Sequence, residues 1–456
     1  MLDLARSRSV SSRATRLRRS ARALTLTVAA ALSITACSVG NVGGKSDGAA
    51  SGGGTTAISF LVGQDPTTTK FAQALIDGFQ KANPDVKVSL ETQPTGTEGD
   101  NLTKTKLSTG EMSDVFYYND GSLLQALSPD TTLVPLGDQP WVSQLTPLFK
   151  TVVSTPKGLY GAPLGSTLAG AVLYNKKVYS DLHLKVPTSW AQFMANNAKI
   201  AQAGKVTPII QSYGTDWTAQ LFVLGDFANV AAQDPNFSKK YTEGKAKYSQ
   251  QPALQGFLNQ QAAHQAGYFN KNFASTTYDD AIKMLATGTG AHYPMLTAAV
   301  AALSASYPKQ LNDVGVFPLP AQNAADTRLT VWMPNALYIP KTTTGAKQDA
   351  AKKFIAWANS AEGCAVQAKM SPPSGPYVIS SCKLPSNAPT LVKDMQPYFD
   401  KKLYTTALEF SSPIKGPNLP NITVQVGSGI STAAAGAKLY DEDVKKQAQQ
   451  LNLPGW

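Results

Sequence analysis

Short apolar runs alternate with segments of helical periodicity along most of this chain. The run at 57–62 is continuous and apolar, which is typical of a buried strand. The apolar residues of the next segment recur every three or four positions until Asn83-Pro84 ends the helix. We predict further strands at 86–90, 114–118, 161–174, 209–210, 314–317 and 336–339, and helices at 189–203, 252–266, 277–286 and 347–358. This order favours an α/β fold with largely parallel sheets.

The N-terminal region departs from this pattern. An apolar run at 24–36 follows a basic stretch, is too short to span a bilayer, and ends directly before Cys37. We interpret 1–36 as a signal peptide and 37–56, rich in Gly and Ser, as a flexible linker. The segment 34–37 (ITAC) resembles a bacterial lipobox, which predicts that Cys37 is lipidated and anchors the exported protein to the outer face of the cell membrane. The alternative is a plain signal peptide that contains a cysteine, and the export route, general secretion or twin-arginine, stays open.

Charge and length narrow the function classes. Residues 1–36 hold seven arginines against one aspartate, so +6 of the net +11 lies there and +5 remains for the rest of the chain. No run of basic residues is interleaved with aromatic residues, and we therefore expect no nucleic-acid partner. The remaining length of about 400 residues exceeds what one hydrophobic core normally organises, which predicts two lobes.

The chain contains three cysteines. Lipidation of Cys37 would leave Cys364 and Cys382 free to pair under the oxidising conditions outside the membrane. The sequence does not show whether the two Cα atoms lie close enough for a bridge, so it does not decide whether this disulfide forms.

Six segments, in order along the chain, carry a family resemblance. They are 79–88 (FQKANPDVKV), 113–120 (SDVFYYND), 159–163 with 173–176 (LYGAP and LYNK), 186–190 (VPTSW), 314–320 (VGVFPLP) and 350–355 (AAKKFI). Together they resemble the extracellular solute-binding proteins of ABC importers, in particular the sugar-binding branch that includes maltose-binding protein. The resemblance implies two lobes with a ligand cleft between them: 57–163 with 330–390, and 164–329 with 391–456. It also implies hinge crossings near 163–169 and 318–329.

The chain departs from the family pattern at two places. The family often has Gly-x-Trp where this chain reads His292-Tyr293-Pro294-Met295, which suggests Tyr293 or Met295 in place of a stacking Trp. The segment 331–335 (VWMPN) stands where the family has a Gly-rich stretch. Trp332 is therefore a second candidate for the cleft, with core packing as the alternative.

A sugar site combines polar side chains, which hydrogen-bond hydroxyls, with aromatic rings, which cover the C–H face. In open α/β sheets such residues lie just beyond the strand ends. This logic, with the resemblance, predicts a ligand site made of Gln64, Asp65, Glu98, Asn119, Asp120, Ser166, Thr167, Trp217, Tyr293, Met295 and Trp332. For several of these a structural role is the alternative, such as a helix cap at Asp65 or an Asp-Gly turn at Asp120.

Catalytic and metal-binding signatures are weak. The three histidines are isolated, and no histidine or cysteine pair has a metal-ligand spacing. Asp65, Asp120 and Asp216 are the carboxylates from which a glycosidase pair would come. The resemblance favours binding, so we expect no enzyme activity, no cofactor and no metal.

These observations lead to one preferred function. We expect a monomeric receptor, tethered through Cys37, that captures a carbohydrate by cleft closure and delivers it to the permease subunits of an ABC importer. The alternatives are a secreted carbohydrate-active enzyme that uses a cleft carboxylate pair, or the same receptor scaffold with a peptide or polyamine as its solute.

Overall fold

The computed structural model describes residues 55–456, which fall within one compact unit, Gly53–Trp456. The signal peptide, most of the linker and Cys37, all expected from the sequence, lie outside the described residues. Among the helices of the described part, none is long and apolar enough to cross a membrane.

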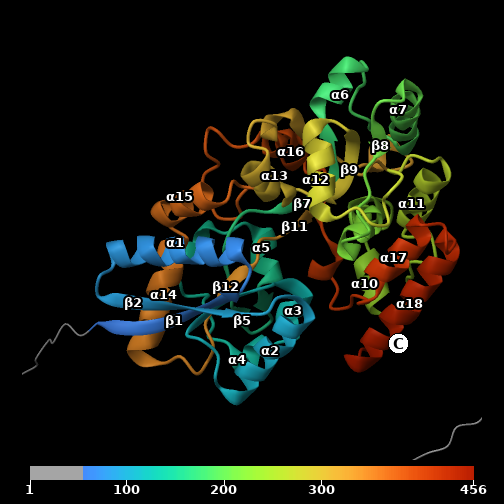
Figure 1. Cartoon of the computed structure of the whole chain (residues 1–456). Coiled ribbons are helices and arrows are strands. Elements are labelled where there is room, and N and C mark those ends of the chain that lie inside the picture. The colour runs from blue at the N-terminus through green and yellow to red at the C-terminus, as the bar shows by residue number, and fades with distance from the viewer. Residues whose placement is uncertain (1–54) are drawn as a thin grey trace, which may run out of the picture. The chain divides into compact units, whose positions relative to one another are not determined.

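The first sheet has the strand order β2-β1-β3-β12-β6. Strands β1 (Thr56–Gly63), β2 (Val86–Gln93) and β3 (Val115–Tyr118) are parallel, whereas β12 (Ala336–Tyr338) runs antiparallel to both β3 and β6 (Ala162–Pro163). Helices α1 (Pro66–Ala82), α14 (Gly345–Ala358) and α15 (Ala361–Met370) pack beside it (Figure 1). Phe354 joins these layers, because its ring lies 5.2 Å from that of Phe60 and 5.1 Å from that of Phe79.

The second sheet is mixed and has the order β13-β11-β7-β9-β8, with β10 also paired to β7. Its strands are β7 (Leu168–Asn175), β8 (Thr207–Ile209), β9 (Gly290–Leu296), β10 (Val314–Pro318), β11 (Leu329–Trp332) and β13 (Tyr404–Thr406). Strand β7 is antiparallel to β9, β10 and β11, so the expected parallel character holds for the start of the first sheet and is wrong for the second. Strand β7 follows β6 of the first sheet along the chain, and the three later strands that pair with it, β9, β10 and β11, all run in the opposite direction.

Helices surround the second sheet and extend to the C-terminus (Figure 1). The longer ones are α7 (Trp190–Ala203), α11 (Gln255–Gln265), α12 (Tyr278–Thr287), α13 (Ala299–Ser306), α16 (Thr390–Asp400), α17 (Leu419–Gly427) and α18 (Ala433–Gln450). Further elements are α2 (Gly96–Thr109) and α3 (Gly121–Gln125), which follow β2 and β3 of the first sheet, and the short α6 (Lys176–Asp181), α9 (Phe227–Gln233), η2 (Asp216–Gln220) and η5 (Leu408–Phe410). The predicted helices at 189–203, 277–286 and 347–358 are confirmed, and the one at 252–266 begins a few residues later.

The chain passes between the sheets at 164–167, between β6 and β7, and at 333–335, between β11 and β12. The first crossing lies where the sequence places it. The second does not lie at 318–329, because Thr330 pairs with Gly170 in β7 and Leu329 pairs with Tyr404 in β13. Residues 329–332 therefore belong to the second sheet, and the chain crosses to the first sheet only after them, at 333–335.

A third connection leaves α15 and reaches α16, which packs against β10 of the second sheet. A disulfide joins Cys364 in α15 to Cys382, with a Cα–Cα distance of 5.2 Å. The bridge closes the loop that contains 371–377, the segment that approaches the first crossing.

Candidate ligand cleft

Two adjoining cavities lie beside the crossings. The first has a volume of about 370 Å³, and the second, of about 300 Å³, lies at the carboxyl ends of β1, β2 and β3. Thr68, Tyr117 and Asn335 line both cavities, so the two are neighbours, and together they are called the cleft below. Each volume falls in the range of small-molecule sites, about 300–1,000 Å³.

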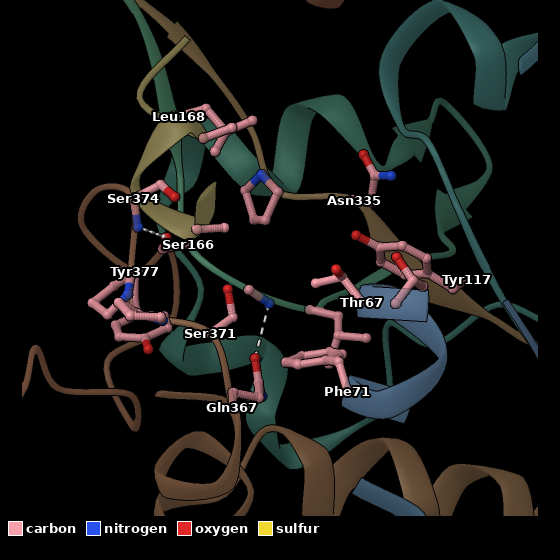
Figure 2. Close-up of a pocket in the computed structure, with 18 of the residues that line it drawn as sticks. Thr67, Phe71, Tyr117, Ser166, Leu168, Asn335, Gln367, Ser371, Ser374 and Tyr377 are labelled. Carbon is pink, nitrogen blue, oxygen red and sulfur yellow. Dashed lines mark hydrogen bonds between the residues drawn. The ribbon is translucent and has the colours of Figure 1, made fainter. Parts of the chain in front are cut away.

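The first cavity has a largely apolar wall with polar groups at its edge (Figure 2). Tyr377 lies on one side, and Phe71 and Tyr117 lie on the opposite side. The second sheet contributes Leu168 at the start of β7, and the start of α13 contributes Ala298 and Ala301. Both sheets and both crossings therefore surround this space.

Hydrogen bonds fasten the wall of the first cavity to the first crossing. They connect α15 and the segment 371–377 to residues 165–167, so the disulfide loop is hydrogen-bonded directly to the crossing. The bonds are Gly165 N–H to Gln367 Oε1 at 2.9 Å, Ser374 N–H to Ser166 Oγ at 2.9 Å, and Thr167 N–H and Oγ1–H to the carbonyl of Pro376, each at 2.9 Å.

The second cavity is polar. Asp65, Gln93, Asp100, Tyr118 and Asn119 line it, from the ends of three neighbouring strands and the helices that follow. Asp65 accepts a hydrogen bond from Thr68 N–H at 2.8 Å and so caps α1. The sequence places these polar groups together because parallel strands end at the same edge of a sheet.

Two buried polar atoms of this cavity have no hydrogen-bond partner among the described residues. They are Oε1 of Gln93 and Oη of Tyr118, whose side chains are 9% and 6% exposed. The amide nitrogen of Gln93 is satisfied, because it donates to Thr103 Oγ1 at 2.7 Å. Buried polar atoms are nearly always paired, so an unpaired donor and acceptor in one cavity indicate a place for a polar ligand.

Tyr117 and Tyr118, two of the three tyrosines that line the cleft, stay protonated at neutral pH. Burial, and then the charges of Asp120 and Asp65, raise the pKa of Tyr117 to about 12. Burial, and then the nearby Asp100 carboxylate, raise the pKa of Tyr118. Both hydroxyls are therefore available as hydrogen-bond donors and acceptors.

Comparison with known proteins identifies the family. The sequence profile of the bacterial extracellular solute-binding proteins matches residues 65–363. The chain belongs to this family.

Individual relatives of this solute-binding protein are distant. The multiple sugar-binding protein of Streptococcus mutans is 23% identical over 323 residues, which cover 69% of this chain and 73% of the relative. RafE of Streptococcus pneumoniae in complex with raffinose matches with a TM-score of 0.71 at 19% identity, over 87% of this chain and all of RafE. The GacH receptor of Streptomyces glaucescens, solved unliganded and with acarbose, matches with a TM-score of 0.70 at 17% identity, over 87% and 99% of the chains.

These matches confirm the two-lobed α/β fold of a type II solute-binding protein. The family also makes the chain an exported protein and a solute receptor, not an enzyme, as the sequence motifs predict. The first sheet with its helices forms one lobe of this solute-binding protein, and the second sheet forms the other.

Three of the predicted ligand residues line the cleft: Asp65 and Asn119 in the second cavity and Ser166 in the first. Thr167 is buried beside Ser166, but its hydroxyl is bonded to Pro376 and it does not line either cavity. Gln64 and Glu98 are exposed and lie outside both linings.

Asp120 is buried next to the cleft and does not line it. Its Oδ2 has no partner among the described residues, and burial, followed by the charge of Glu409, raises its pKa well above the usual range. The next residue, Gly121, has a φ of 59° and a Cβ there would meet Glu409 O and Phe410 Cδ1, each at 2.8 Å. Asp120 therefore stands at the N-cap of α3, directly before a left-handed glycine, and α3 approaches η5 there.

The predicted aromatic positions are mostly structural. Trp217 is 37% exposed in η2, packs against Tyr278 with ring centroids 5.7 Å apart, and lies outside the two cavities. Trp332 is buried and donates from Nε1 to Glu409 Oε1 at 2.5 Å, so the packing alternative describes it in this structure.

Tyr293 and Met295 do not reach the cleft. Both are fully buried in β9, and Tyr293 Oη lies 2.6 Å from Ser212 Oγ. Strand β9 pairs with β7 on one side and β8 on the other, and α12 also packs against it, so its side chains lie in the core. Their expected role in replacing the family's stacking Trp is not supported here.

Several cleft residues were not predicted from the sequence. The strongest are Gln93, Asp100, Tyr118, Asn335 and Tyr377. Gln93 ends β2, which runs past the predicted strand 86–90, so a correct strand end would have brought it under the strand-end rule. Tyr117 and Tyr118 lie within the predicted third strand, and the period of a strand does not reveal that both contact the cleft.

The histidine with the most contacts is structural. Burial lowers the pKa of His292 to about 3, and its ring nitrogens contact Tyr179, Asn197 and Pro208 at 2.7–2.9 Å. Within residues 55–456, no group of three histidine, cysteine or acidic side chains is arranged to hold a metal ion.

Proposed function

We propose that this solute-binding protein captures a carbohydrate in the cleft and delivers it to the permease subunits of an ABC importer. We further propose that a lipid on Cys37 tethers a monomeric receptor to the outer face of the cell membrane. A tether raises the local concentration of the receptor at its transporter. The motif at 34–37 and the Gly/Ser-rich segment after it support the tether.

The main support for a carbohydrate ligand is the chemistry of the cleft. A sugar has hydroxyl groups at its edge and an apolar C–H face, so it needs polar groups beside an apolar wall. The second cavity supplies Asp65, Gln93 and Asn119, and the first supplies Phe71 and Tyr377. The relatives with raffinose, acarbose and multiple sugars in their names support the same ligand class.

Closure follows from the position of the cleft between the two sheets. A ligand that contacts Asn119 of the first lobe and Ala298 of the second gains contacts as the lobes approach each other. Because only the closed state provides both sets, the ligand shifts the equilibrium toward it. The segments 164–167 and 333–335 are short enough to serve as hinges.

A thermal-shift screen of the purified protein tests this function. The panel is raffinose, maltotriose, cellotriose and chitotriose, with spermidine and a tripeptide for the competing solute classes. We expect at least one sugar to raise the melting temperature. At a sugar concentration of 100 times Kd, binding stabilises the folded state by about 2.7 kcal/mol. Chromatography should recover that sugar unchanged. A shift with only spermidine or the tripeptide, or conversion of a sugar to products, contradicts the proposal.

A further inference from the structure

The cleft has no positive charge. Neither cavity is lined by a lysine, arginine or histidine of the described residues, whereas Asp65 and Asp100 both line the second cavity. This is notable in a chain whose net charge is +11, of which +5 lies after residue 36. The basic residues lie elsewhere, and the surface that meets the ligand is neutral or acidic.

The second cavity presents two carboxylates and one unpaired amide oxygen, beside Asn119, Asn335 and hydroxyl groups that can also donate. Asp65 uses one carboxylate oxygen to cap α1, and the Asp100 carboxylate lies near the Tyr118 hydroxyl. Oε1 of Gln93 is a buried acceptor without a partner, and the Gln93 amide is held in place by Thr103. The unpaired Tyr118 hydroxyl adds one group that can donate or accept.

These acceptors distinguish ligands by charge. Sugar hydroxyls and ammonium groups donate hydrogen bonds, so they satisfy the Gln93 oxygen and the two carboxylates. A ligand carboxylate or phosphate would be desolvated beside Asp65 and Asp100 with no cation to pair it. Like charges placed together across an interface repel each other, so an anionic ligand is disfavoured.

We propose that the cleft selects glycans by charge: it binds neutral sugars, binds amino sugars at least as tightly, and excludes uronic acids and sugar phosphates. The inference rests on the proposed sugar-receptor function and adds the charge class of the sugar. In the complex, hydroxyl or ammonium groups at one end of the glycan donate to Gln93, Asp65 and Asp100. The apolar wall of the first cavity covers the C–H faces of the adjoining rings.

Matched ligands test the proposal by calorimetry. Each of raffinose, maltotriose, cellotriose and chitotriose is compared with its derivative oxidised to a carboxylate at C6, where the sugar has a free C6 hydroxyl. Chitotriose is also compared with its de-N-acetylated form, which carries ammonium groups. For any neutral sugar that binds, we expect the C6-carboxylate to bind at least tenfold more weakly. Added salt should narrow this difference, because it screens the repulsion.

Two variants distinguish charge repulsion in the cleft from a nonspecific loss of binding or folding. Asp100→Asn keeps the shape of the side chain and removes its charge, so the ratio of the C6-carboxylate Kd to the neutral-sugar Kd should fall severalfold, whatever the change in neutral-sugar affinity itself. Asp77→Asn is the matched control, because Asp77 is exposed on α1 and does not line either cavity. It should leave this ratio unchanged. Circular dichroism confirms that both variants are folded.

The outcomes distinguish the two proposals. If a C6-carboxylate binds as tightly as its neutral parent or more tightly, selection by charge is wrong and the sugar receptor stands. A Kd ratio that Asp100→Asn leaves unchanged also overturns the assigned cause. If none of the sugars binds, neutral or charged, the proposed function fails and this inference fails with it.

Discussion

Gln93→Leu is expected to weaken sugar binding without weakening the fold. The substitution removes the buried Oε1 that has no partner in the described residues, and the amide that donates to Thr103 Oγ1 at 2.7 Å. Relief of an unpaired buried acceptor gains about 1–3 kcal/mol, and leaving the buried Thr103 hydroxyl without its partner costs about 1–3 kcal/mol, so the two effects offset each other. The free energy of unfolding of the ligand-free protein should therefore stay within about 1–2 kcal/mol of the wild type.

Sugar affinity, in contrast, should fall. A hydroxyl that binds Gln93 Oε1 would be left unpaired against a leucine, which costs about 1–3 kcal/mol, or about 5- to 150-fold in Kd. Urea unfolding measures the first quantity, and calorimetric titration with a sugar from the panel measures the second. The prediction is specific because sugar affinity changes while the free energy of unfolding of the ligand-free protein changes little.

Gln80→Leu is the matched control in the same lobe. Gln80 Oε1 accepts from Val88 N–H at 3.0 Å, so its loss leaves a backbone donor unpaired and should lower the free energy of unfolding by about 1–3 kcal/mol. Gln80 does not line either cavity, so its replacement should leave Kd unchanged. If Gln93→Leu destabilises the protein as Gln80→Leu does and leaves Kd unchanged, Gln93 is a structural residue and the reasoning is refuted.

Three further predictions concern the rest of the chain. Replacing Cys364 and Cys382 with Ser opens a loop of 18 residues in sequence separation. This should cost about 3 kcal/mol in urea unfolding and weaken sugar binding, because the loop forms the cavity wall; unchanged stability and affinity would contradict it. Burial raises the pKa of Asp226 to about 7, so the folded state holds a proton that the unfolded state has lost. Wild-type stability should therefore fall, relative to Asp226→Asn, as the pH rises from about 4 to about 7 and no further above; equal pH profiles in urea unfolding would refute this. Cys37→Ser should move the protein from the membrane fraction to the soluble exported fraction, and retention in the membrane would argue against the lipid.

The sequence predicted the first lobe better than the second for a physical reason. Strands β1, β2 and β3 follow one another in parallel with helices between them, so local periodicity is enough to place them. Strand β11 belongs to the second sheet only because Thr330 pairs with Gly170, far away along the chain. No local pattern reports such a pairing, and the second crossing was therefore placed too early.

The same limit applies to the cleft. Asp65, Asn119 and Ser166 follow strand ends or crossings, and the strand-end rule finds them. Tyr293 fits the resemblance equally well, but its burial depends on what covers both faces of β9. The unpaired oxygens of Gln93 and Tyr118 are visible only when their neighbours are in place. Site chemistry was thus predictable by residue type, and its exact members were not.

A crystal structure of the protein with a bound sugar from the panel tests the central claim most directly. We predict a sugar ring in the second cavity, with a hydroxyl within hydrogen-bond distance of Gln93 Oε1 and the adjoining ring against Tyr377 or Phe71 in the first. A sugar bound elsewhere, with these two cavities free of it, would contradict the account.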